Sequence, residues 1–525
     1  MAEMPDENSD STRDSWASTT RGKSGSANGR TNGRGKSPPA KKQQLTRAGQ
    51  PIDRRQRLRI PPHHVTKQTP HDRVHNWEEV YYGYTAGPAM FEAQRCIQCP
   101  AAPCTVACPV DNDIPGALAF LEIGKLADAA AVFRQTSEMP ELCGRLCPQE
   151  ALCEGSCVVG KNAKPVAIGK LEAFLGDWDR EQRGGFPVPT PEMETGQRVA
   201  VVGSGPAGLA AAEQMRAAGH AVTVFEAWPS AGGVLRYGIP NFKTAKDIVD
   251  EKVKALQAAG VEFRFDTRIG TDIGWDELSY WDAVFLGHGA SMGKRLGLDG
   301  ERLARVYSAT EFLVRANLGD DLLPAALWTA PDVGRKVVVV GGGDTSMDCV
   351  RSAVRLGAEQ VTLLYRRTEN EMMGREEERR HAREEGVIFE YLTTPVGLIK
   401  KDGAVVGVEC VRMSLGEPDE SGRRRPQPVP GSEFVVDCDA FVVAVGYDVG
   451  RDVYGDSGID VNDWGEVLVD EQGRTSKPGV FAGGDNVIGA DLVVTALRGA
   501  HAAIPAMLTF LEEQQMERAL AMAAG

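Results

Sequence analysis

Eight of the eleven cysteines in this 525-residue sequence lie between Cys96 and Cys157. The first four follow the pattern Cys-x2-Cys-x4-Cys-x3-Cys-Pro, and the second four follow Cys-x3-Cys-Pro-x4-Cys-x3-Cys. Thiolates spaced this closely and accompanied by proline are typical of sequences that wrap iron–sulfur cubanes. Four thiolates per cubane predict two [4Fe–4S] clusters. Zinc is the main competing ligand, because Cys-x2-Cys also occurs in zinc sites, and disulfides are a weaker third possibility.

A second chemistry-bearing stretch begins at Val199 and reads VAVVGSGPAGLAAAEQMRAAGHAVTVFEA. A short apolar run leads into Gly-x-Gly-x-x-Gly, a helical pattern follows, and a second apolar run ends in an acid. The glycines allow a tight turn, the approach of a pyrophosphate and close helix packing. The helix N-terminus attracts the phosphates, and the acid accepts from a ribose hydroxyl. This pattern predicts a dinucleotide site made by Gly203, Gly205, Pro206, Ala207, Gly208 and Glu226.

Another dinucleotide motif begins at Lys336 with a run of valines that leads into three glycines. Its second strand ends in two arginines, where a site selective for NADH would carry an acid. An acid there repels a 2′-phosphate, whereas an arginine pair can bind one bidentately. Arg375 could assist, although the Arg/Glu-rich pattern from Arg375 to Glu385 predicts a solvated, salt-bridged helix face. The motif predicts an NADPH site made by Gly342, Gly343, Asp344, Thr345, Arg366 and Arg367.

Near the C-terminus, a predicted strand from Gly479 runs into Gly-Gly-Asp and is followed by an apolar helix from about Leu492 to Leu511. Asp485 is expected to accept from the ribityl chain of a flavin. The helix N-terminus, with Leu492 and Val493, is expected to face the isoalloxazine. Two nucleotide motifs and this closing segment together predict a flavin domain that is interrupted by a pyridine-nucleotide domain.

The domain organisation follows from these motifs and from the composition of the first 60 residues. That segment is rich in Ser, Gly, Asn, Lys and Arg and poor in large apolar residues, so it cannot bury enough surface to order itself. The predicted fold class is α/β with two Rossmann-like domains. The expected parts are a disordered basic arm (1–60), a helical iron–sulfur domain (61–195), the first part of an FAD domain (196–290), an NADPH domain (291–446) and the second part of the FAD domain (447–525).

Charge and hydropathy restrict the partners of the chain. The net charge of −14 argues against general nucleic-acid binding by the folded part. No apolar run approaches the length expected of a membrane span, and no signal peptide is recognisable. We therefore expect a cytoplasmic protein without membrane contact, whose cysteines are ligands rather than disulfides.

From about residue 73 to residue 502 the sequence resembles the family of small (β) subunits of bacterial NADPH-dependent glutamate synthase. The motifs that carry the resemblance are RCIQCPAAPCTVACPVDNDIP, CGRLCPQEALCEGSCV, GSGPAGLAAAE, YGIPNFK, GGGDTSMDCVR, LLYRR and GVFAGGDNVIGADLVV. The resemblance implies that the first dinucleotide motif binds FAD and the second binds NADPH. It implies hydride transfer between cofactors without a catalytic side chain. The implied partner is the large FMN-containing glutamate synthase subunit, in a hetero-oligomer.

The resemblance also implies a set of cluster ligands that differs from the one the spacing predicts. One cubane would take Cys96, Cys99, Cys104 and Cys157, and the other Cys108, Cys147, Cys153 and Glu172. Cys143 would then be spare, whereas the spacing alone makes all eight cysteines ligands. The remaining implied cofactor contacts are Gly233 and Lys243 at the flavin, and Ala444 and Gly446 at the nicotinamide.

Three other functions compete with this one. A disulfide reductase of the thioredoxin-reductase type needs a redox dithiol, but the later cysteines Cys349, Cys410 and Cys438 have no such spacing. The same NADPH-oxidising module could instead serve another acceptor, such as a pyrimidine dehydrogenase subunit or a ferredoxin. A non-enzymatic nucleotide sensor, with structural redox centres, is the third alternative.

Overall fold

The computed structural model describes residues 45–319, 322–418 and 424–524. Most of the predicted basic arm therefore lies outside the described residues. Residues 45–60, which we assigned to that arm, are placed and include α1 (Arg54–Arg57), capped by Asp53. Arg54 donates to the carbonyl of Ile97 at 2.9 Å and Arg57 to that of Cys96 at 2.8 Å. The described fold begins before residue 60 because these hydrogen bonds, and the packing of Leu58 against the helical core, hold this segment.

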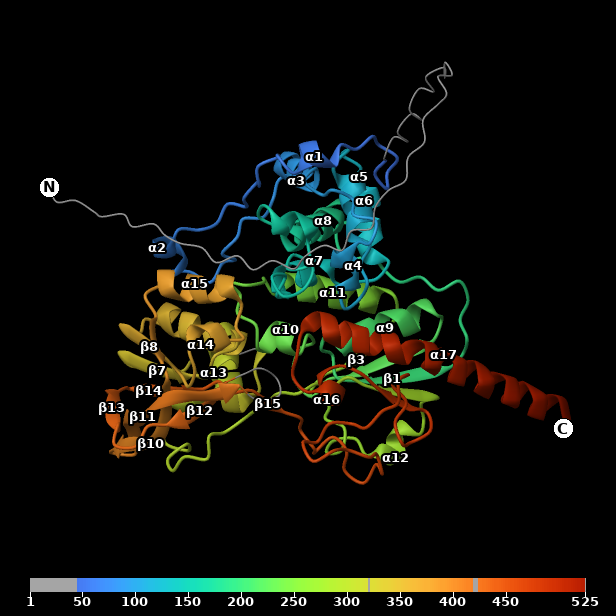
Figure 1. Ribbon diagram of the computed structural model, residues 1–525. Coiled ribbons are helices and arrows are strands. Elements are labelled where there is room, and N and C mark those ends of the chain that lie inside the picture. The colour runs from blue at the N-terminus through green and yellow to red at the C-terminus, as the bar shows by residue number, and fades with distance from the viewer. Residues whose placement is uncertain (1–44, 320–321, 419–423, 525) are drawn as a thin grey trace, which may run out of the picture. The chain divides into compact units, whose positions relative to one another are not determined.

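The iron–sulfur part of the chain is helical, as Figure 1 shows at the blue and teal end of the colour range. The stretch 114–134 between the two cysteine groups forms two helices, which separate at Gly124, where φ is +77°. Phe133, Leu118 and Leu171 belong to the core that these helices enclose. The elements are α2 (Pro70–Arg73), α3 (Ala86–Ala93), α4 (Pro103–Val106), α5 (Ile114–Leu121), α6 (Leu126–Arg134), α7 (Pro140–Leu146), η1 (Val158–Lys161) and α8 (Ile168–Arg183).

The first nucleotide motif lies in a five-stranded sheet with the order β16-β4-β1-β2-β3, in which neighbouring strands are parallel. Its strands are β1 (Arg198–Val202), β2 (Ala221–Phe225), β3 (Glu262–Arg264), β4 (Ala283–Leu286) and β16 (Val480–Ala482). The accompanying helices are α9 (Pro206–Ala217), α10 (Val234–Tyr237), α11 (Asp247–Ala258), α12 (Trp275–Leu278), α16 (Asp485–Ile488) and α17 (Val493–Ala524). Val480 pairs with Val284 across almost 200 positions of sequence. The predicted interruption of this domain is confirmed.

The second nucleotide motif lies in a separate parallel sheet with the order β6-β14-β7-β8-β9. Its elements are β6 (Val306–Ser308), α13 (Ala309–Asn317), η3 (Ala325–Leu327), β7 (Lys336–Val340), α14 (Asp344–Arg355), β8 (Gln360–Tyr365), η4 (Glu369–Glu371), α15 (Glu376–Glu384), β9 (Ile388–Tyr391) and β14 (Ala440–Val443). The sequence did not predict the antiparallel addition of β10 (Thr393–Lys401), β11 (Ala404–Pro418), β12 (Arg424–Pro428) and β13 (Phe434–Asp437). The chain passes between the two domains twice, and the two connecting segments pair as β5 (Met292–Gly293) and β15 (Tyr447–Asp448).

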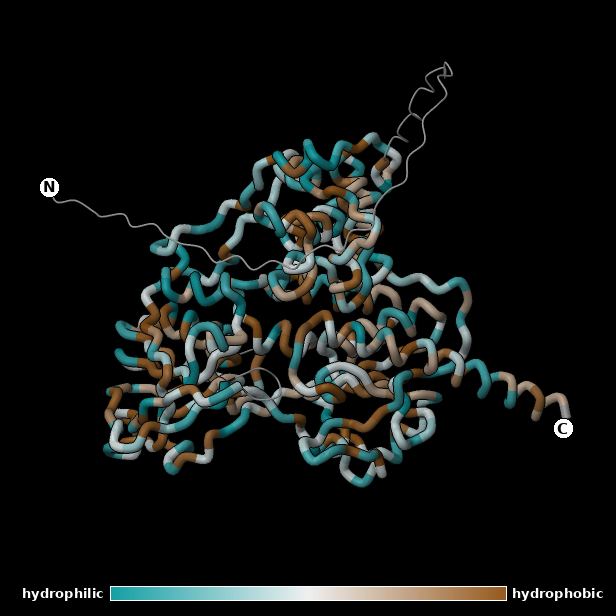
Figure 2. Tube along the Cα trace, viewed as in Figure 1, coloured by the Kyte–Doolittle hydropathy of each residue, from teal (hydrophilic) through white to brown (hydrophobic). Residues whose placement is uncertain are grey.

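From the sequence we expected no apolar run as long as a membrane span, and the long C-terminal helix α17 corrects that expectation. Within the described residues it is the one helix that is long and apolar enough to cross a membrane, although half of its apolar window is buried inside the protein. Leu497, Ile504 and Leu511 are completely or almost completely buried, and α17 packs against α9. Figure 2 shows hydrophilic and hydrophobic residues mixed along its projecting end. Burial of its apolar face against the flavin domain is the physical reason for its composition.

Buried ion pairs join the iron–sulfur part to the second nucleotide domain. Arg73, at the end of α2, donates to Glu385 at 2.6 Å, and neither side chain is exposed. Arg351 and Arg355 on α14 also donate to Glu385, at 2.9 and 2.8 Å. One carboxylate therefore accepts hydrogen bonds from three guanidinium groups that come from two parts of the fold.

Replacing Glu385 with Gln should destabilise the protein by about 3–5 kcal/mol, because it leaves buried arginines without their counter-charge. Urea unfolding followed by circular dichroism measures the change. The matched control is Glu359→Gln, which removes a carboxylate from an exposed pair with Arg335 and should cost less than about 1 kcal/mol. Equal effects of the two substitutions would contradict the structural role of the buried network.

Candidate functional site

The loop after β1 is shaped by glycines at the N-terminus of α9. Gly203 has φ +93°, and a Cβ there would lie 2.7 Å from the carbonyl oxygen of Gly287, so the turn needs glycine. A Cβ on Gly208 would collide with the backbone of Gly203. The absence of a side chain at Gly208 therefore allows the helix to lie close to the strand. Gly205, the N-cap residue of α9, has no described atom within 4 Å of an ideal Cβ. The loop thus leaves open space at the helix N-terminus, where a pyrophosphate would bind.

Glu226 lies directly after β2 and is hydrogen-bonded within the same loop. It accepts from the backbone N–H of Ser204 at 3.1 Å and from that of Trp228 at 2.9 Å. Burial raises the pKa of Glu226 above its ordinary value, and the hydrogen bonds from Ser204 and Trp228 oppose that rise. Gly233 approaches from another segment, since a Cβ on it would lie 2.8 Å from the Cα of Gly205. Both predicted residues therefore adjoin the first glycine loop.

The Gly-Gly-Asp segment after β16 packs against the same loop. A Cβ on Gly484 would lie 2.9 Å from the Cβ of Ala207, near the start of α9. Asp485 follows, and its Oδ1 is buried without a hydrogen-bond partner among the described residues. Burial raises the pKa of Asp485 to about 7. A carboxylate in this state gains from a hydroxyl donor on a ligand, so these residues fit the ribityl chain of a flavin.

Lys243 was predicted to contact the flavin, but the structure turns its ammonium group toward the second nucleotide domain. It forms an ion pair with Asp348 on α14 at 2.8 Å and lies 4.0 Å from Glu378 on α15. Its side chain is only 8% exposed. The charged end of Lys243 therefore links the two nucleotide-binding domains.

The second glycine loop repeats the geometry of the first. Gly341 has φ +151°, and a Cβ there would collide with the carbonyl of Ala444 at the end of β14. Gly343 is the N-cap residue of α14 and has open space around an ideal Cβ, with no described atom within 4 Å. Tyr447, which follows Gly446 in sequence, donates its hydroxyl to Thr345 at 3.3 Å. The structure thus brings the predicted glycine-loop and nicotinamide residues together.

The predicted arginine pair at the end of β8 is divided by the structure. Arg366 is exposed. Arg367 is buried, and its Nε donates to the carbonyl of Arg424 on β12 at 2.9 Å. The unpredicted strand β12 thus occupies the Nε of Arg367, and the pairing of both guanidinium groups with one phosphate stays a prediction.

Four cysteines from both sequence groups line one pocket with apolar walls. Its lining includes Cys96, Cys99, Cys104 and Cys157. Burial, together with neighbouring thiols, raises the pKa of Cys96 to about 12 and that of Cys104 to about 11. These thiols are protonated at neutral pH unless a cationic ligand binds them, and iron deprotonates coordinating thiols. This set matches the resemblance and not the local spacing, which grouped the first four cysteines with one another.

The remaining cysteines surround Glu172 on α8. Burial, and next the charge of Glu172, raises the pKa of Cys108 to about 11. The pKa of Cys153 is raised most by burial, next by Glu154 and then by Glu172. The pKa of Cys147 is raised by its hydrogen bond with Cys143, by burial and, to a smaller extent, by Glu172. Burial raises the pKa of Glu172 itself to about 8, and the amide of Asn112 donates to it at 3.1 Å. Cys143 lies beside Cys147, so the structure keeps it within the second group.

The arrangement of these groups bears on the zinc alternative. No set of three or more His, Cys, Asp or Glu side chains within the described ranges could hold a single metal ion. A zinc ion needs its ligand atoms about 2.0–2.3 Å away, so four thiolates must converge on one point. A cubane is larger and accepts ligands that surround a pocket. Metal analysis of the purified protein decides between clusters and zinc.

Two family descriptions match the chain over these sites. Residues 197–504 match pyridine nucleotide-disulphide oxidoreductase, and residues 73–184 match dihydropyrimidine dehydrogenase domain II, 4Fe-4S cluster. The chain is also 40% identical over 444 residues to the glutamate synthase [NADPH] small chain of Escherichia coli (strain K12), covering 83% of this chain and 94% of that protein. The chain belongs to the glutamate synthase small-chain family. It is an NADPH-dependent oxidoreductase with a flavin- and nucleotide-binding fold and a 4Fe–4S domain.

Other proteins share this likeness. The NADP(+)-dependent formate dehydrogenase subunit beta of Moorella thermoacetica is 39% identical over 429 residues, covering 77% of this chain and 59% of that protein. Among solved structures, FprA of Mycobacterium tuberculosis in complex with NADPH aligns with a TM-score of 0.53 and 21% identity, covering 62% of this chain and 86% of that chain. That alignment supports the fold of this small-chain relative and nothing finer.

Sequence reasoning missed several residues of these sites. Ser204 holds Glu226, Asn112 donates to Glu172, and Asp348 pairs with Lys243. Each of the three lies within a motif that was recognised, so its position carried a signal. The partners, however, lie between 22 and 105 positions away in sequence, and no local pattern identifies them.

Gly205→Ala should weaken FAD binding at least tenfold while changing stability by less than about 1 kcal/mol. The added methyl group meets no described protein atom but occupies the space above the helix N-terminus. Gly274→Ala is the control, since Gly274 is also an N-cap glycine with open surroundings and an extended backbone. Flavin content of the purified proteins and their thermal unfolding are the measurements. Full flavin content in the Gly205 variant would contradict the assignment of this loop.

Proposed function

We propose that this oxidoreductase passes electrons from NADPH through FAD and two [4Fe–4S] clusters to a partner protein. When bound, FAD would supply the acceptor for a hydride from NADPH, and the clusters would supply one-electron transfer. The proposed partner is the large FMN-containing subunit of glutamate synthase, which makes L-glutamate from 2-oxoglutarate and glutamine. The two subunits would form a cytoplasmic hetero-oligomer. The side chains of this chain bind, orient and shield the cofactors, and none is assigned to proton transfer.

The NADPH site in this proposal uses the loop after β7. The backbone N–H groups around Gly342 and Gly343 and the N-terminus of α14 bind the pyrophosphate. Arg366 binds the 2′-phosphate, while Arg367 holds β12 against the end of β8. Ala444 and Gly446 line the nicotinamide side of the site.

The FAD site uses the loop after β1. The glycines between Gly203 and Gly208 and the N-terminus of α9 bind the pyrophosphate, and Glu226 accepts from the adenosine ribose. Asp485 accepts from the ribityl chain, and the backbone at Leu492 and Val493 faces the isoalloxazine. The support is the burial of Asp485 beside an open helix N-terminus.

The cluster ligands in this proposal are those of the resemblance, Cys96, Cys99, Cys104 and Cys157 for one and Cys108, Cys147, Cys153 and Glu172 for the other. Glu172 is preferred over Cys143 as the eighth ligand. A carboxylate that is 6% exposed and has one amide partner is costly to bury, and coordination to iron would stabilise it. Cys143 accepts from the hydroxyl of Ser137 at 3.8 Å and is compatible with a packing role.

The observation that carries the proposal is the pocket formed by thiols from both cysteine groups in a chain that also contains two open glycine loops. Coverage of 94% of the E. coli small chain supports glutamate synthase as the assembly. A second candidate is the same module with another acceptor. The likeness to a formate dehydrogenase subunit, of which the chain covers 59%, favours it.

Iron, sulfide and flavin analysis of anaerobically purified protein tests the proposal. We expect about eight iron, eight sulfide and one FAD per chain, and bleaching of the flavin absorbance by NADPH. Cys153→Ala should lose about four iron atoms, whereas Cys349→Ala, at a buried cysteine of the nucleotide domain, should retain eight. Zinc at the thiolates would contradict the proposal. A flavin that NADPH does not bleach would also contradict it, and either result would favour the sensor alternative. Co-purification with the large subunit distinguishes the two acceptors.

Arg366→Ser should raise the KM for NADPH by about 10–100-fold and leave the KM for NADH unchanged. Charge-assisted hydrogen bonds to phosphate contribute about 1.5–3 kcal/mol, and each 1.4 kcal/mol is a factor of ten. Steady-state reduction of ferricyanide provides the measurement. Arg335→Ser is the control, because Arg335 is exposed and precedes β7 at the opposite end of the strand. An unchanged preference for NADPH in the Arg366 variant would rule out this role.

A further inference from the structure

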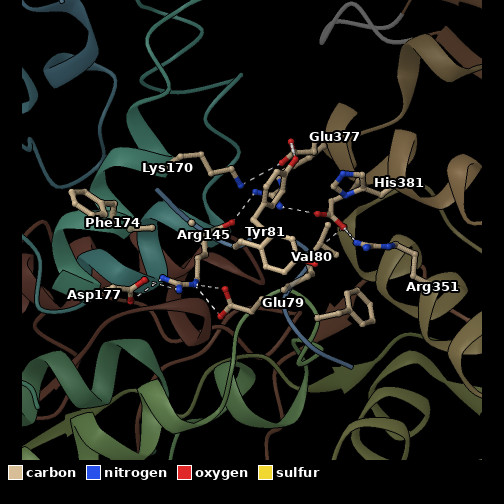
Figure 3. A pocket seen from close by; sticks show the side chains of 17 residues that line it. Glu79, Val80, Tyr81, Arg145, Lys170, Phe174, Asp177, Arg351, Glu377 and His381 are labelled. Atoms are coloured by element: carbon tan, nitrogen blue, oxygen red, sulfur yellow. Dashed lines mark hydrogen bonds and ion pairs between the residues drawn. The ribbon is translucent and has the colours of Figure 1, made fainter. Parts of the chain in front are cut away.

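A charged pocket lies where the iron–sulfur part, the flavin domain and the second nucleotide domain meet. Figure 3 shows Arg145, Lys170 and Asp177 on one side of it and Arg351, Glu377 and His381 on the other. Arg375, at the start of α15, also lines this pocket. The sequence predicted a solvated arginine here, but Arg375 is only 6% exposed.

The backbone before α15 is tied to the nucleotide loop by three hydrogen bonds. The N–H groups of Met373 and Gly374 donate to the carbonyl of Gly342 at 3.1 and 2.9 Å. The N–H of Arg375 donates to the carboxylate of Asp344 at 2.9 Å. The position of Arg375 therefore depends on the conformation of the loop from Gly342 to Asp344.

The side chain of Arg375 reaches the iron–sulfur part. One guanidinium nitrogen donates to the carbonyl of Cys147 at 3.0 Å and to that of Arg145 at 3.2 Å. The other donates to Glu378 at 3.1 Å, which holds the guanidinium plane in place. Glu150 adds a further link, since it accepts from the N–H of Glu376 at 3.1 Å. A buried cation that donates to the backbone of a cluster ligand stabilises the extra electron of the reduced cluster.

We propose that Arg375 is a positioning residue through which nucleotide binding sets the reduction potential of the cluster held by Cys147. This inference rests on the proposed function, because it needs Cys147 to be a cluster ligand. Phosphates bound at the N-terminus of α14 fix the loop from Gly342 to Asp344 and thereby hold the guanidinium against the Cys147 carbonyl. The potential of this cluster is then higher in the nucleotide complex than in the free enzyme, which favours electron delivery only when the nucleotide is bound.

Potentiometry monitored by electron paramagnetic resonance, with and without 2′,5′-ADP, tests this role in the anaerobic holoenzyme. This compound carries the two phosphates of the adenosine half of NADPH and cannot be reduced. In the wild type we expect it to raise the midpoint potential of one cluster by about 59 mV, which corresponds to a tenfold change in the one-electron equilibrium constant. Arg375→Gln should lower that potential in the free enzyme and abolish the upward shift.

Arg380→Gln is the matched control, because Arg380 lies on the same helix with its side chain 55% exposed, and it should behave as the wild type. If Arg375→Gln does not fold, Arg375→Lys provides the test. It keeps the charge but not the planar fork, and it should keep less than half of the shift. An equal shift in wild type and variant, or no shift in the wild type, overturns the proposal. Four iron atoms per chain would overturn the two-cluster assignment and this role together, and the iron count distinguishes that failure.

Discussion

Arg351 is completely buried on α14 and donates to two carboxylates, Glu378 and Glu385, while its guanidinium lies 4.4 Å from the ring centroid of Phe242 in the flavin domain. Glu385 in turn neutralises Arg73 from the iron–sulfur part. Burying charges costs several kcal/mol per ion, so such a cluster is stable only when every partner is present. Because the partners come from all three parts of the fold, the network fixes their mutual positions. Electron transfer between separately bound cofactors depends on that fixed geometry.

The two glycine loops show how one local solution serves two ligands. In each, a glycine with positive φ ends a strand, and a glycine at the N-cap of the next helix leaves open space. The loops differ in the segments that close over them. The flavin loop is closed by Gly233 and by Gly484, which precedes Asp485. The pyridine-nucleotide loop instead contacts Gly374 and Arg375, which connect it to the iron–sulfur part. Specificity and communication thus arise outside the shared motif.

The sequence predicted what local pattern can carry and failed where distant residues decide. The strand, glycine loop and helix at Val199 and at Lys336 follow from periodicity and turn chemistry. Spacing alone grouped Cys96 with Cys108, whereas the structure lines one pocket with Cys96 and Cys157, because loop closure between the helices brings distant cysteines together. The Arg/Glu-rich pattern predicted a solvated helix face at Arg375, because a charge pattern in sequence does not distinguish solvated ion pairs from buried ones. The hydrogen bond from Arg367 to β12 was not predicted, because no sequence pattern indicated the strand that accepts it.

The use of arginine in the inter-domain pocket has a chemical reason. Burial lowers the pKa of Lys170, which lines the same pocket, below its ordinary value. A guanidinium stays protonated at every physiological pH and can donate to two carbonyls and a carboxylate at once, as Arg375 does. The charge that Arg375 places beside the backbone of Cys147 is therefore independent of pH. Carboxylates such as Glu378 keep the pocket close to neutral, so the permanent charge can be buried without unfolding the interface.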